Sequence, residues 1–554
     1  MLHPNAAIFF ADDAYLMDRP KLMGRQSAGA GFLKGFVGHS GVSELRCVTS
    51  SPSAANSFSR LCREFGAVEQ RISRAPLHAL PAVADIGTLY LPGPMLAEMA
   101  WRRRRGDSAG FSLFGVTHTI SSHGAIDSLA DMLTAPVEPW DSIVCTSKPV
   151  LDATRRLLEA EGERLAERFC GKAPPLPQLS LVPLGVDSDA LAPNDALRLK
   201  WRQKLDVQEN DIMFLFVGRL SFHAKANPYP MLVAAERACQ ETGKRVHLVQ
   251  AGWFANDGIE SAFRESAKVL CPSVVCHFLD GREIDVRTEI WHAADVFVSL
   301  SDNIQETFGL TPIEAMAAGL PCIVSDWNGY RDTVRDGVDG FRIPTLAPCP
   351  GLGKDLAARH EDAVDNYDRY IGLSSLFVAV DVEATAQAFV RLAGDGDLRK
   401  RMAANALERA RQEFDWSVII RRYQAIWVEL SAIRHSAKAK PAPAIPNPRR
   451  ADPFWFFSEY PTRFLNPSDR IEAVSPGDGA DFQYLIGQCP ITSFGQELVP
   501  TAKQCGVILE ILATQKTMTA DQLSRAVDPQ RPLHVLRSLA YLAKIGIVRV
   551  VAAC

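Results

Sequence analysis

The sequence has no long hydrophobic stretch. Nowhere do about 18 apolar residues run together, which is the least that a membrane-spanning helix needs. The N-terminal residues, MLHPNAAIFFADDAYLMDRP, lack the basic region and apolar core of a secretion signal. A large charge excess is also missing, because 60 Lys and Arg stand against 64 Asp and Glu. We therefore expect a cytoplasmic protein for which nucleic acid is not a partner of the whole chain.

Cysteine pairs at metal-binding spacing are missing too. The 12 cysteines are scattered singly, and the closest pair, Cys271 and Cys276, has no second pair at zinc-site spacing. We predict reduced thiols, no metal and no cofactor. No internal repeat of fixed period is found.

What the sequence does have is length and a regular alternation of elements. At 554 residues it exceeds what one hydrophobic core organises. Short runs rich in Val, Ile and Phe alternate with helical patterns, which is typical of parallel sheets covered by helices. We expect strands at AAIFFA, LRCVTS, FGVTH and SIVCTS in a first unit, and at IMFLFVGRL, RVHLVQAGW, VVCHFLD, DVFVSLS and PCIVSD in a second.

Changes in composition predict the domain boundaries. Residues 1–190 and 191–434 form the two α/β domains, and the Pro-rich and charged segment 435–453 is a linker. A third domain follows at 454–554. Its predicted elements are helices at 502–514, 520–527 and 532–545 and a closing strand, IVRVVA, which together resemble a winged-helix module.

The third domain is only mildly basic. From residue 498 to the end there are seven Lys and Arg against three Asp and Glu. In its last helix, mostly Leu, Ala and Val, the main polar side chains are His534, Arg537, Tyr541 and Lys544, whereas major-groove reading requires several polar side chains at the helix N-terminus. We expect this domain to dock a protein or to dimerise. The alternative is a DNA-binding regulator with a degenerate enzyme domain.

Most of the chemical information lies in SDNIQETFGLTPIEAMAAGLPCIVSDWNGYRDT, residues 301–333. This segment follows a predicted strand, and ligands of doubly wound sheets bind beyond the carboxyl ends of strands. Thr311, followed by Pro and by Glu314, predicts a helix start with Thr311 as N-cap. The free N–H groups of such a start, approached by Gly309, suit a diphosphate. Spacing alone leaves Glu314 open between a capping-box carboxylate and a ligand-binding one, and it favours a solvated loop carboxylate at Glu306.

Glu306 and Glu314 stand eight residues apart, with Phe-Gly after the first and EAMAAGLPCIVSD after the second. This arrangement closely resembles the E-x7-E signature of retaining family 4 glycosyltransferases (glycosyl transferases group 1), whose GT-B fold places two Rossmann-like domains around a cleft. The resemblance implies that Glu306 contacts donor-sugar hydroxyls and Glu314 the ribose hydroxyls. The amides around Phe308, Gly309 and Leu310 would then face the phosphates.

FVGRL at 216–220, with Lys225 after it, resembles the family's G-R-L…K element. Gly218 then borders the donor, while Arg219 and Lys225 neutralise the departing diphosphate, where fixed cations lower the barrier. The spacing to Lys225 is one residue longer than usual, and Ala replaces a typical Gly after it. A surface lysine and a strand-end arginine are the alternatives.

Two motifs of the first domain extend the resemblance, which covers about 22–430. GRQSAG, beginning at Gly24, resembles the family's glycine loop before the first long helix, bordering the acceptor and the reacting phosphate. His118, at the carboxyl end of a predicted strand, matches the family's active-site histidine near the donor sugar, with a purely structural histidine as the alternative. The P-x-G-x-D match at Pro183, Gly185 and Asp187 implies a geometric role between the domains.

The resemblance implies transfer of a sugar from a nucleoside-diphosphate sugar with retention at the anomeric carbon, the leaving phosphate taking the acceptor's proton. The acceptor, a saccharide, a lipid-linked glycan or a protein, is left open. A GT-B-type nucleotide-sugar epimerase is the alternative enzyme.

WRRRR at 101–105 is the other conspicuous motif. A solvated charged loop is one interpretation. The other is that the arginines contact an anionic acceptor or bring the protein to a membrane surface.

Overall fold

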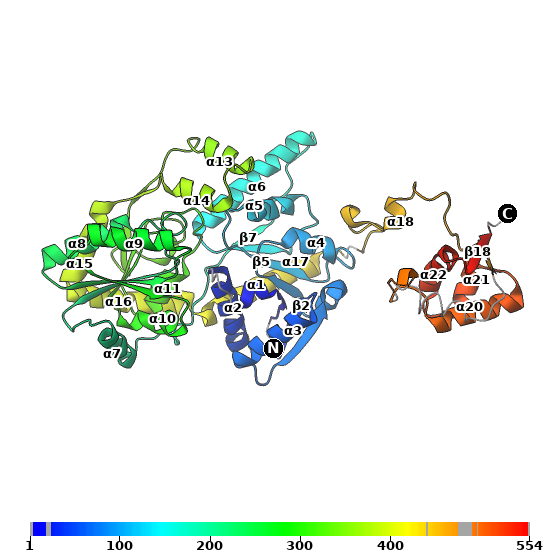
Figure 1. The fold of residues 1–554 in the computed structure, drawn as a ribbon, viewed down its shortest axis with the longest axis horizontal. Helices are drawn as coiled ribbons and strands as arrows, with labels where there is room; N and C mark the ends of the chain where they lie inside the picture. Colours follow the sequence, from blue (N-terminus) through cyan, green and yellow to red (C-terminus); the bar gives the residue numbers. More distant parts are fainter. Residues whose placement is uncertain are drawn as a thin grey trace. The chain divides into compact units, whose positions relative to one another are not determined.

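The computed structural model describes residues 4–17, 24–438, 441–474 and 490–551 apart from 493 and 496. It contains two compact units, Met1–Arg449 and Arg450–Cys554 (Figure 1). In the described ranges, no helix is long and apolar enough to cross a membrane.

The first unit begins with a seven-stranded parallel sheet of order β3-β2-β1-β4-β5-β6-β7. Its strands are β1 (Ala7–Phe9), β2 (Glu44–Thr49), β3 (Arg71–Pro76), β4 (Thr88–Leu91), β5 (Ser112–Val116), β6 (Ser142–Cys145) and β7 (Gln178–Leu181). Its helices are α1 (Asp12–Tyr15), α2 (Gly24–His39), α3 (Pro52–Glu64), α4 (Leu96–Arg103), α5 (His123–Ala130) and α6 (Lys148–Arg168).

A second parallel sheet, of order β10-β9-β8-β11-β12-β13, follows in the same unit. Its strands are β8 (Ile212–Val217), β9 (Val246–Gly252), β10 (Val275–Asp280), β11 (Val296–Ser299), β12 (Cys322–Ser325) and β13 (Gly340–Ile343). Helices α7 (Asp195–Lys204), α8 (Tyr229–Thr242), α9 (Asp257–Leu270), α10 (Ile284–Glu289), α11 (Leu310–Ala317), α12 (Tyr330–Thr333), α15 (Val382–Gly394) and α16 (Gly396–Arg409) accompany it.

The α/β prediction with two Rossmann-like sheets is confirmed, and every predicted strand is present. The central strands are buried along their length, as sheets covered on both faces require. In the second sheet the strand order reverses between β8 and β11, and ligands of such sheets bind at this point.

The expected glycine loop at GRQSAG is wrong in its conformation, because α2 already begins at Gly24. Gly29 and Gly35 of this helix serve close packing instead. A Cβ on Gly29 would lie 2.0 Å from the carbonyl oxygen of Ala14, and one on Gly35 would lie 2.6 Å from Cβ of Trp416. Sequence alone does not distinguish these glycines from turn glycines.

Helix α17 (Trp416–Ser436) follows the second sheet in the chain but packs on the first. Its aromatic stripe meets α2 and β5: Tyr423 packs edge-on against Phe114 with ring centroids 5.1 Å apart, and Trp427 lies 6.0 Å from Phe36. Where the chain returns, the N–H of Val186 donates to the carbonyl of Phe414, and the N–H of Trp416 donates to the carbonyl of Val186.

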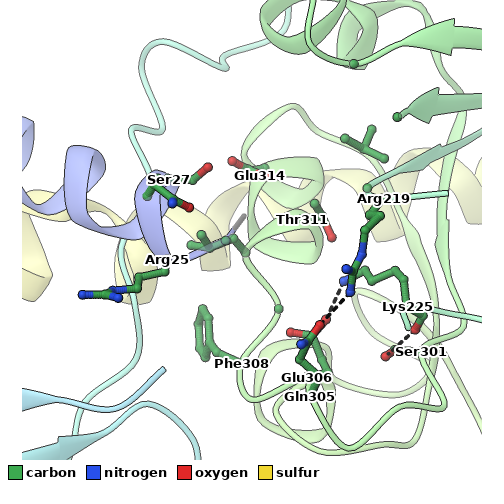
Figure 2. A pocket seen from close by; sticks show the side chains of 18 of the residues that line it. Arg25, Ser27, Arg219, Lys225, Ser301, Gln305, Glu306, Phe308, Thr311 and Glu314 are labelled. Atoms are coloured by element: carbon green, nitrogen blue, oxygen red, sulfur yellow. Dashed lines mark hydrogen bonds and ion pairs between the residues drawn. The ribbon is translucent and has the colours of Figure 1, made fainter. Parts of the chain in front are cut away.

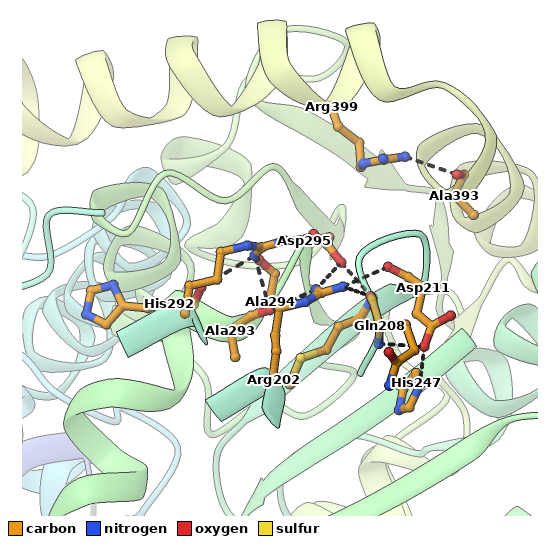
Figure 3. Close-up of polar contacts among 12 residues, drawn as sticks. Arg202, Gln208, Asp211, His247, His292, Ala293, Ala294, Asp295, Ala393 and Arg399 are labelled. Atoms are coloured by element: carbon orange, nitrogen blue, oxygen red, sulfur yellow. Dashed lines mark hydrogen bonds and ion pairs between the residues drawn. The ribbon is translucent and has the colours of Figure 1, made fainter. Parts of the chain in front are cut away.

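A polar network fixes α7 at the amino ends of β8 and β11, the end of the sheet away from its ligand-binding edge (Figure 3). Arg202 donates to Asp295 Oδ2 at 3.1 Å and to the carbonyl of Asp211 at 3.1 Å. Asp295 Oδ2 also accepts from the N–H of Met213. The buried His247 contacts Asp211 through Nε2 at 3.2 Å. This network stabilises the second domain and is remote from the chemistry.

Between β13 and α15 the chain makes an additional loop, residues 347–378, here called the excursion. The short antiparallel pair β14 (Thr345–Leu346) and β15 (Ala379–Val380) closes its base. It carries helices α13 (Lys354–Glu361) and α14 (Tyr367–Ser375), and Arg359 and Arg369 both pair with the buried Asp365 between them. In Figure 1, α13 and α14 lie beside α5 and α6 of the first domain.

The second unit contains the predicted elements of the third domain. They are α20 (Ala502–Gln515), α21 (Ala520–Val527), α22 (Pro532–Lys544) and β18 (Val548–Val551), preceded by α18 (Pro453–Phe456). Strands β16 (Arg470–Ala473) and β17 (Met518–Thr519), which the sequence analysis did not predict, complete an antiparallel sheet of order β17-β16-β18.

Candidate functional site

A cavity of about 530 Å³ opens between the two parallel sheets of the first unit. Every residue for which the sequence predicted a catalytic or donor-binding role lines it: Gly24, His118, Gly218, Arg219, Lys225, Glu306, Phe308, Gly309, Leu310 and Glu314. These residues come from the carboxyl ends of β5, β8 and β11 and from the starts of α2 and α11. The fold thus brings together positions that are far apart in the chain.

Helix α11 starts differently from the sequence prediction. Its N-cap is Gly309, with φ of 90°, and not Thr311. Gly is required there both for this backbone conformation and because a Cβ would lie 2.1 Å from Cε1 of Tyr330. The hydroxyl of Thr311 is buried and has no partner among the described residues, so the capping box with Glu314 is not formed. The N–H groups of the first turn remain available to an anion.

Lys225 and Glu306 form an ion pair at the edge of this cavity. Lys225 Nζ lies 2.5 Å from Glu306 Oε2, and the side chains are only 19% and 14% exposed. Burial opposes ionisation of Glu306, but the Lys225 ammonium holds the pKa of this carboxyl below its usual value. The interpretation of Glu306 as a solvated loop carboxylate is therefore wrong. Neither is Lys225 a surface lysine.

Arg219 reaches the same edge from the end of β8 (Figure 2). Its Nη2 donates to Gln305 Oε1 and to the carbonyl of Ala224, both at 2.8 Å. Burial lowers the pKa of Arg219, and the nearby Asp368 and Tyr367 oppose this shift. Two cations, Arg219 and Lys225, thus line one part of the cavity, where they can bind a diphosphate.

Glu314 lies on the other side of the α11 start, half-buried. Burial raises the pKa of its carboxyl to about 7, and the charge of Lys225 only partly counteracts this. A carboxylate in this position can accept bonds from vicinal hydroxyls of a ligand. Asp302, in the loop after β11, has a pKa raised by burial to about 7 as well, but it does not line the cavity.

His118 faces the cavity from the first domain. Its Nε2 lies 3.2 Å from the carbonyl oxygen of Pro92, and because a carbonyl only accepts, Nε2 carries the proton. Burial and the charge of Arg25 lower the pKa of His118 to about 4, although the bond to Pro92 opposes the shift. The ring is therefore neutral at physiological pH and presents Nδ1 as a hydrogen-bond acceptor.

Sequence reasoning missed a further part of the cavity. Trp253 comes directly after β9, and Arg282 comes two residues after the end of β10. Arg287 and Trp291 come from α10 and the turn after it. Trp253 and Arg282 stand where the strand-end rule predicts ligand contacts, so the same signal that pointed to 301–310 could have found them. In the first domain, Arg25 of α2 was missed too; Figure 2 shows it across the cavity from Arg219.

The arginine run at 101–105 is solvated only in part, since Arg105 is exposed and Arg103 is buried. Arg103 is 1% exposed and forms a bidentate pair with the buried Asp141, at 2.6 and 2.7 Å. Arg102 pairs with Glu98, and Arg104 stacks over the ring of Trp101. The predicted contact of the whole run with an anionic acceptor is therefore unsupported by its geometry, since its central member fastens α4 to β6.

Residues 198–348 match the family described as Glycosyl transferases group 1. The chain contains a group 1 glycosyltransferase domain. A D-inositol 3-phosphate glycosyltransferase of Geodermatophilus obscurus is 31% identical over 260 residues, which are 46% of this chain and 54% of that protein. Another from Stackebrandtia nassauensis is 27% identical over 311 residues, or 55% of this chain and 61% of that protein. The chain thus spans little more than half the length of these curated relatives.

Among solved structures, Anabaena HepE in complex with UDP and glucose is similar with a TM-score of 0.50 and 15% identity, over 77% of this chain and 100% of that one. This likeness shows the GT-B fold. The matched glycosyltransferase domain contributes Arg219, Lys225, Glu306 and Glu314, whereas His118 lies outside it. Most of the excursion also lies beyond the matched residues. In the described ranges, no three His, Cys, Asp or Glu side chains gather in a metal-binding arrangement.

Proposed function

We propose that this protein transfers a sugar from a nucleoside-diphosphate sugar to an acceptor hydroxyl, with retention of anomeric configuration, as a family 4 enzyme of the group 1 glycosyltransferases. One observation carries the proposal: Arg219, Lys225 and Glu306 meet at one edge of a large cavity, opposite His118 of the other domain. The match to a group 1 glycosyltransferase domain and the likeness to a GT-B structure support the same activity.

Arg219 and Lys225 lie where they can contact a leaving diphosphate. Its phosphates bind the N–H groups at the start of α11, and the side chains of Arg219 and Lys225 neutralise charge that grows as the sugar departs. Because this charge is largest in the transition state, the two side chains lower the barrier more than they tighten donor binding.

The carboxylates bind hydroxyls of the donor. Glu306 accepts from the sugar while remaining ionised through Lys225, and Glu314 accepts from the ribose. His118 accepts a sugar hydroxyl at Nδ1, since its Nε2 proton is held by Pro92. The acceptor proton passes to the departing phosphate, so no protein nucleophile is needed.

A panel of UDP-, GDP-, ADP- and CDP-sugars tests the proposal, first by thermal shift, because a bound ligand raises the apparent stability. Transfer is then assayed with the donor that binds, using a set of acceptors that includes D-inositol 3-phosphate, the acceptor in the names of the curated relatives. The product's anomeric configuration is read by NMR. Inverted product would contradict retention, and isomerised donor in the absence of acceptor would identify an epimerase instead.

Arg219→Ala and Glu306→Gln should each reduce transfer by about a hundredfold or more, which corresponds to the loss of about 2.7 kcal/mol of transition-state stabilisation. Arg264→Ala, a surface substitution on α9, is the matched control and should leave transfer unchanged. Rates within about threefold of wild type in both site variants would rule out these roles.

For the C-terminal unit we propose a winged-helix-like docking or dimerisation module. Val535, Leu539 and Leu542 of α22 are buried in the unit's own core, and the exposed face of the helix offers the cations Arg537 and Lys544. Two cations are few for DNA. Salt-sensitive, sequence-selective binding in a gel-shift assay would contradict the proposal, and concentration-dependent association that is lost on truncation after residue 449 would support it.

A further inference from the structure

The excursion reaches from the second domain to the first beside the cavity. Helix α14 rests on the loop that follows Arg219: a Cβ on Gly372 would lie 3.1 Å from Cβ of His223, and the carbonyls of His223 and Ile371 both accept from Asn303 Nδ2. On the first domain, His360 of α13 stacks on His123 at the start of α5, with ring centroids 3.9 Å apart. The excursion thus has a contact on each side.

Tyr367, the first residue of α14, joins the two sides by hydrogen bonds. Its hydroxyl lies 3.0 Å from Gln305 Nε2 and 2.9 Å from Ser121 Oγ. Thr119 Oγ1 is 3.3 Å away. Gln305 Oε1 in turn accepts from Arg219. A continuous chain of bonds therefore runs from the Arg219 guanidinium to the loop just after His118.

The polarity of the first two bonds of this chain, from Arg219 to Gln305 and from Gln305 to Tyr367, is fixed. A guanidinium only donates, so the oxygen of the Gln305 amide must face Arg219 and its nitrogen must face Tyr367. The amide nitrogen only donates as well, so the tyrosine oxygen accepts from it. Beyond this bond the tyrosine hydroxyl lies within hydrogen-bond distance of the hydroxyls of Ser121 and Thr119. Bonds aligned in one direction strengthen one another. Without the tyrosine hydroxyl, the amide loses the partner that fixes its orientation toward Arg219.

We propose that Tyr367 is a positioning residue for sugar transfer: through Gln305 it holds Arg219 toward the diphosphate, and through Ser121 it couples this position to the first domain. This inference rests on the proposed function only in naming the diphosphate as the group that Arg219 meets. It gives the excursion a role in the reaction, since it brings a hydroxyl to the place where the two domains meet.

Tyr367→Phe removes the hydroxyl and keeps the ring. The matched control is Tyr370→Phe, one turn later on the same helix, where the ring stacks on His360 and the hydroxyl has no hydrogen bond among the described residues. We expect Tyr367→Phe to lower kcat about fivefold and to change the donor KM less than twofold, and Tyr370→Phe to change neither. An equal effect of the two substitutions would overturn the proposal.

A double-mutant cycle distinguishes positioning from a general loss of structure. If Tyr367 acts through Gln305, then adding Tyr367→Phe to Gln305→Ala costs no further activity. The same fivefold loss in both backgrounds would show that Tyr367 does not act through the amide. Ser121→Ala tests the hydrogen bond between Tyr367 and the first domain. It should affect kcat less, because Thr119 Oγ1 also lies near the tyrosine hydroxyl.

Hydrogen exchange of the free, full-length protein gives a readout that needs no activity. Tyr367→Phe should accelerate amide exchange at 117–124 and at 303–307, while Tyr370→Phe should leave both segments as in wild type. Unchanged exchange in Tyr367→Phe would contradict the coupling even in an active enzyme. If no nucleotide sugar is used but exchange rises as expected, the proposed function fails and the coupling stands.

Discussion

Lys225 and Glu306 neutralise each other across the ends of two neighbouring strands, with Nζ 2.5 Å from Oε2. Each is expected to contact a different part of the donor, the lysine a phosphate and the glutamate a sugar hydroxyl. The pair keeps both groups charged in a largely buried place, where either one alone would favour its neutral form. Both groups are therefore already charged in the protein without a ligand.

Replacing Lys225 should move the pH dependence of activity. Burial alone raises the pKa of a carboxyl, so in Lys225→Met the pKa of Glu306 should rise from its present lowered value. Under the proposed role, the ionised carboxylate of Glu306 accepts a sugar hydroxyl. As the pH falls, the variant should therefore lose activity at a higher pH than the wild type does. The pH profile of kcat between 5 and 9 measures this. Lys268→Met, on the exposed face of α9, is the control; superimposable acid limbs would contradict the prediction.

Nucleotide binding should depend on the protonation of Glu314, whose pKa burial raises from 4.5 to about 7. Under the proposed role, ribose hydroxyls donate to the ionised carboxylate, so nucleotide affinity should increase as the pH rises through about 7 and then level off. Titration calorimetry between pH 6 and 8 should show this in wild type and a flat profile in Glu314→Gln.

Asp302→Asn is the matched control for Glu314, since Asp302 has a pKa of about 7 as well but lies outside the cavity. Each folded-state pKa is raised, so each carboxyl keeps a proton that the unfolded chain has released. The contribution of each protonated carboxyl to the free energy of unfolding is full below pH 4 and is lost as the pH rises through about 7. Asp302→Asn should therefore flatten the pH dependence of stability and leave that of nucleotide affinity unchanged. A flattened binding profile in this variant would rule out the specific role of Glu314.

Substitutions within the arginine run should have very different effects on the free energy of unfolding. Arg103→Ala leaves Asp141 buried without its bidentate partner, and the free energy of unfolding should fall by about 3–5 kcal/mol. Arg105→Ala changes an exposed side chain, and its effect should stay within about 0.5 kcal/mol. Urea unfolding measures both. Similar losses would show that Arg103 contributes no more than a surface charge.

Two glycines of α2 should respond oppositely to alanine. A Cβ at Gly35 meets Trp416 at 2.6 Å, so Gly35→Ala should destabilise the protein by about 1–3 kcal/mol. Gly38 has no atom within 4 Å of such a Cβ, and Gly38→Ala should stabilise by about 0.5–1 kcal/mol through helix propensity. Thermal unfolding compares the pair. A stabilising Gly35→Ala would mean that α2 does not approach Trp416 this closely.

The parts of the site that could be predicted from the sequence are those in which one short segment contains both the strand pattern and the functional residue. Arg219 stands just beyond the end of β8, and Glu306 lies in the loop that follows β11. Parallel strands place their carboxyl ends at one edge of the sheet. The start of α11 was misplaced by two residues. Thr-Pro is the better local start, but the positive φ of Gly309 and its packing on Tyr330 decide the cap.

Tyr367 could not be predicted, because its partners are distant in the chain. Gln305 is 62 residues away and Ser121 is 246 residues away, and no pattern around Tyr367 differs from that of an ordinary amphipathic helix. The same holds for Arg103: the run of arginines was evident, but which member turns inward depends on Asp141, 38 residues later. Contacts of this kind arise from the tertiary fold.

The hydrogen bonds between the segments at Val186 and Trp416 also bear on which fragments of the protein can fold alone. Because α17 returns to the first sheet, the second domain is, in terms of connectivity, an insertion into the first, entered and left through two adjacent segments bonded to each other. A fragment that stops near Leu191 would leave the aromatic faces of Phe36 and Phe114 uncovered. A permuted chain, with 416–436 joined ahead of residue 4, would supply that cover and is the better way to obtain the first domain alone.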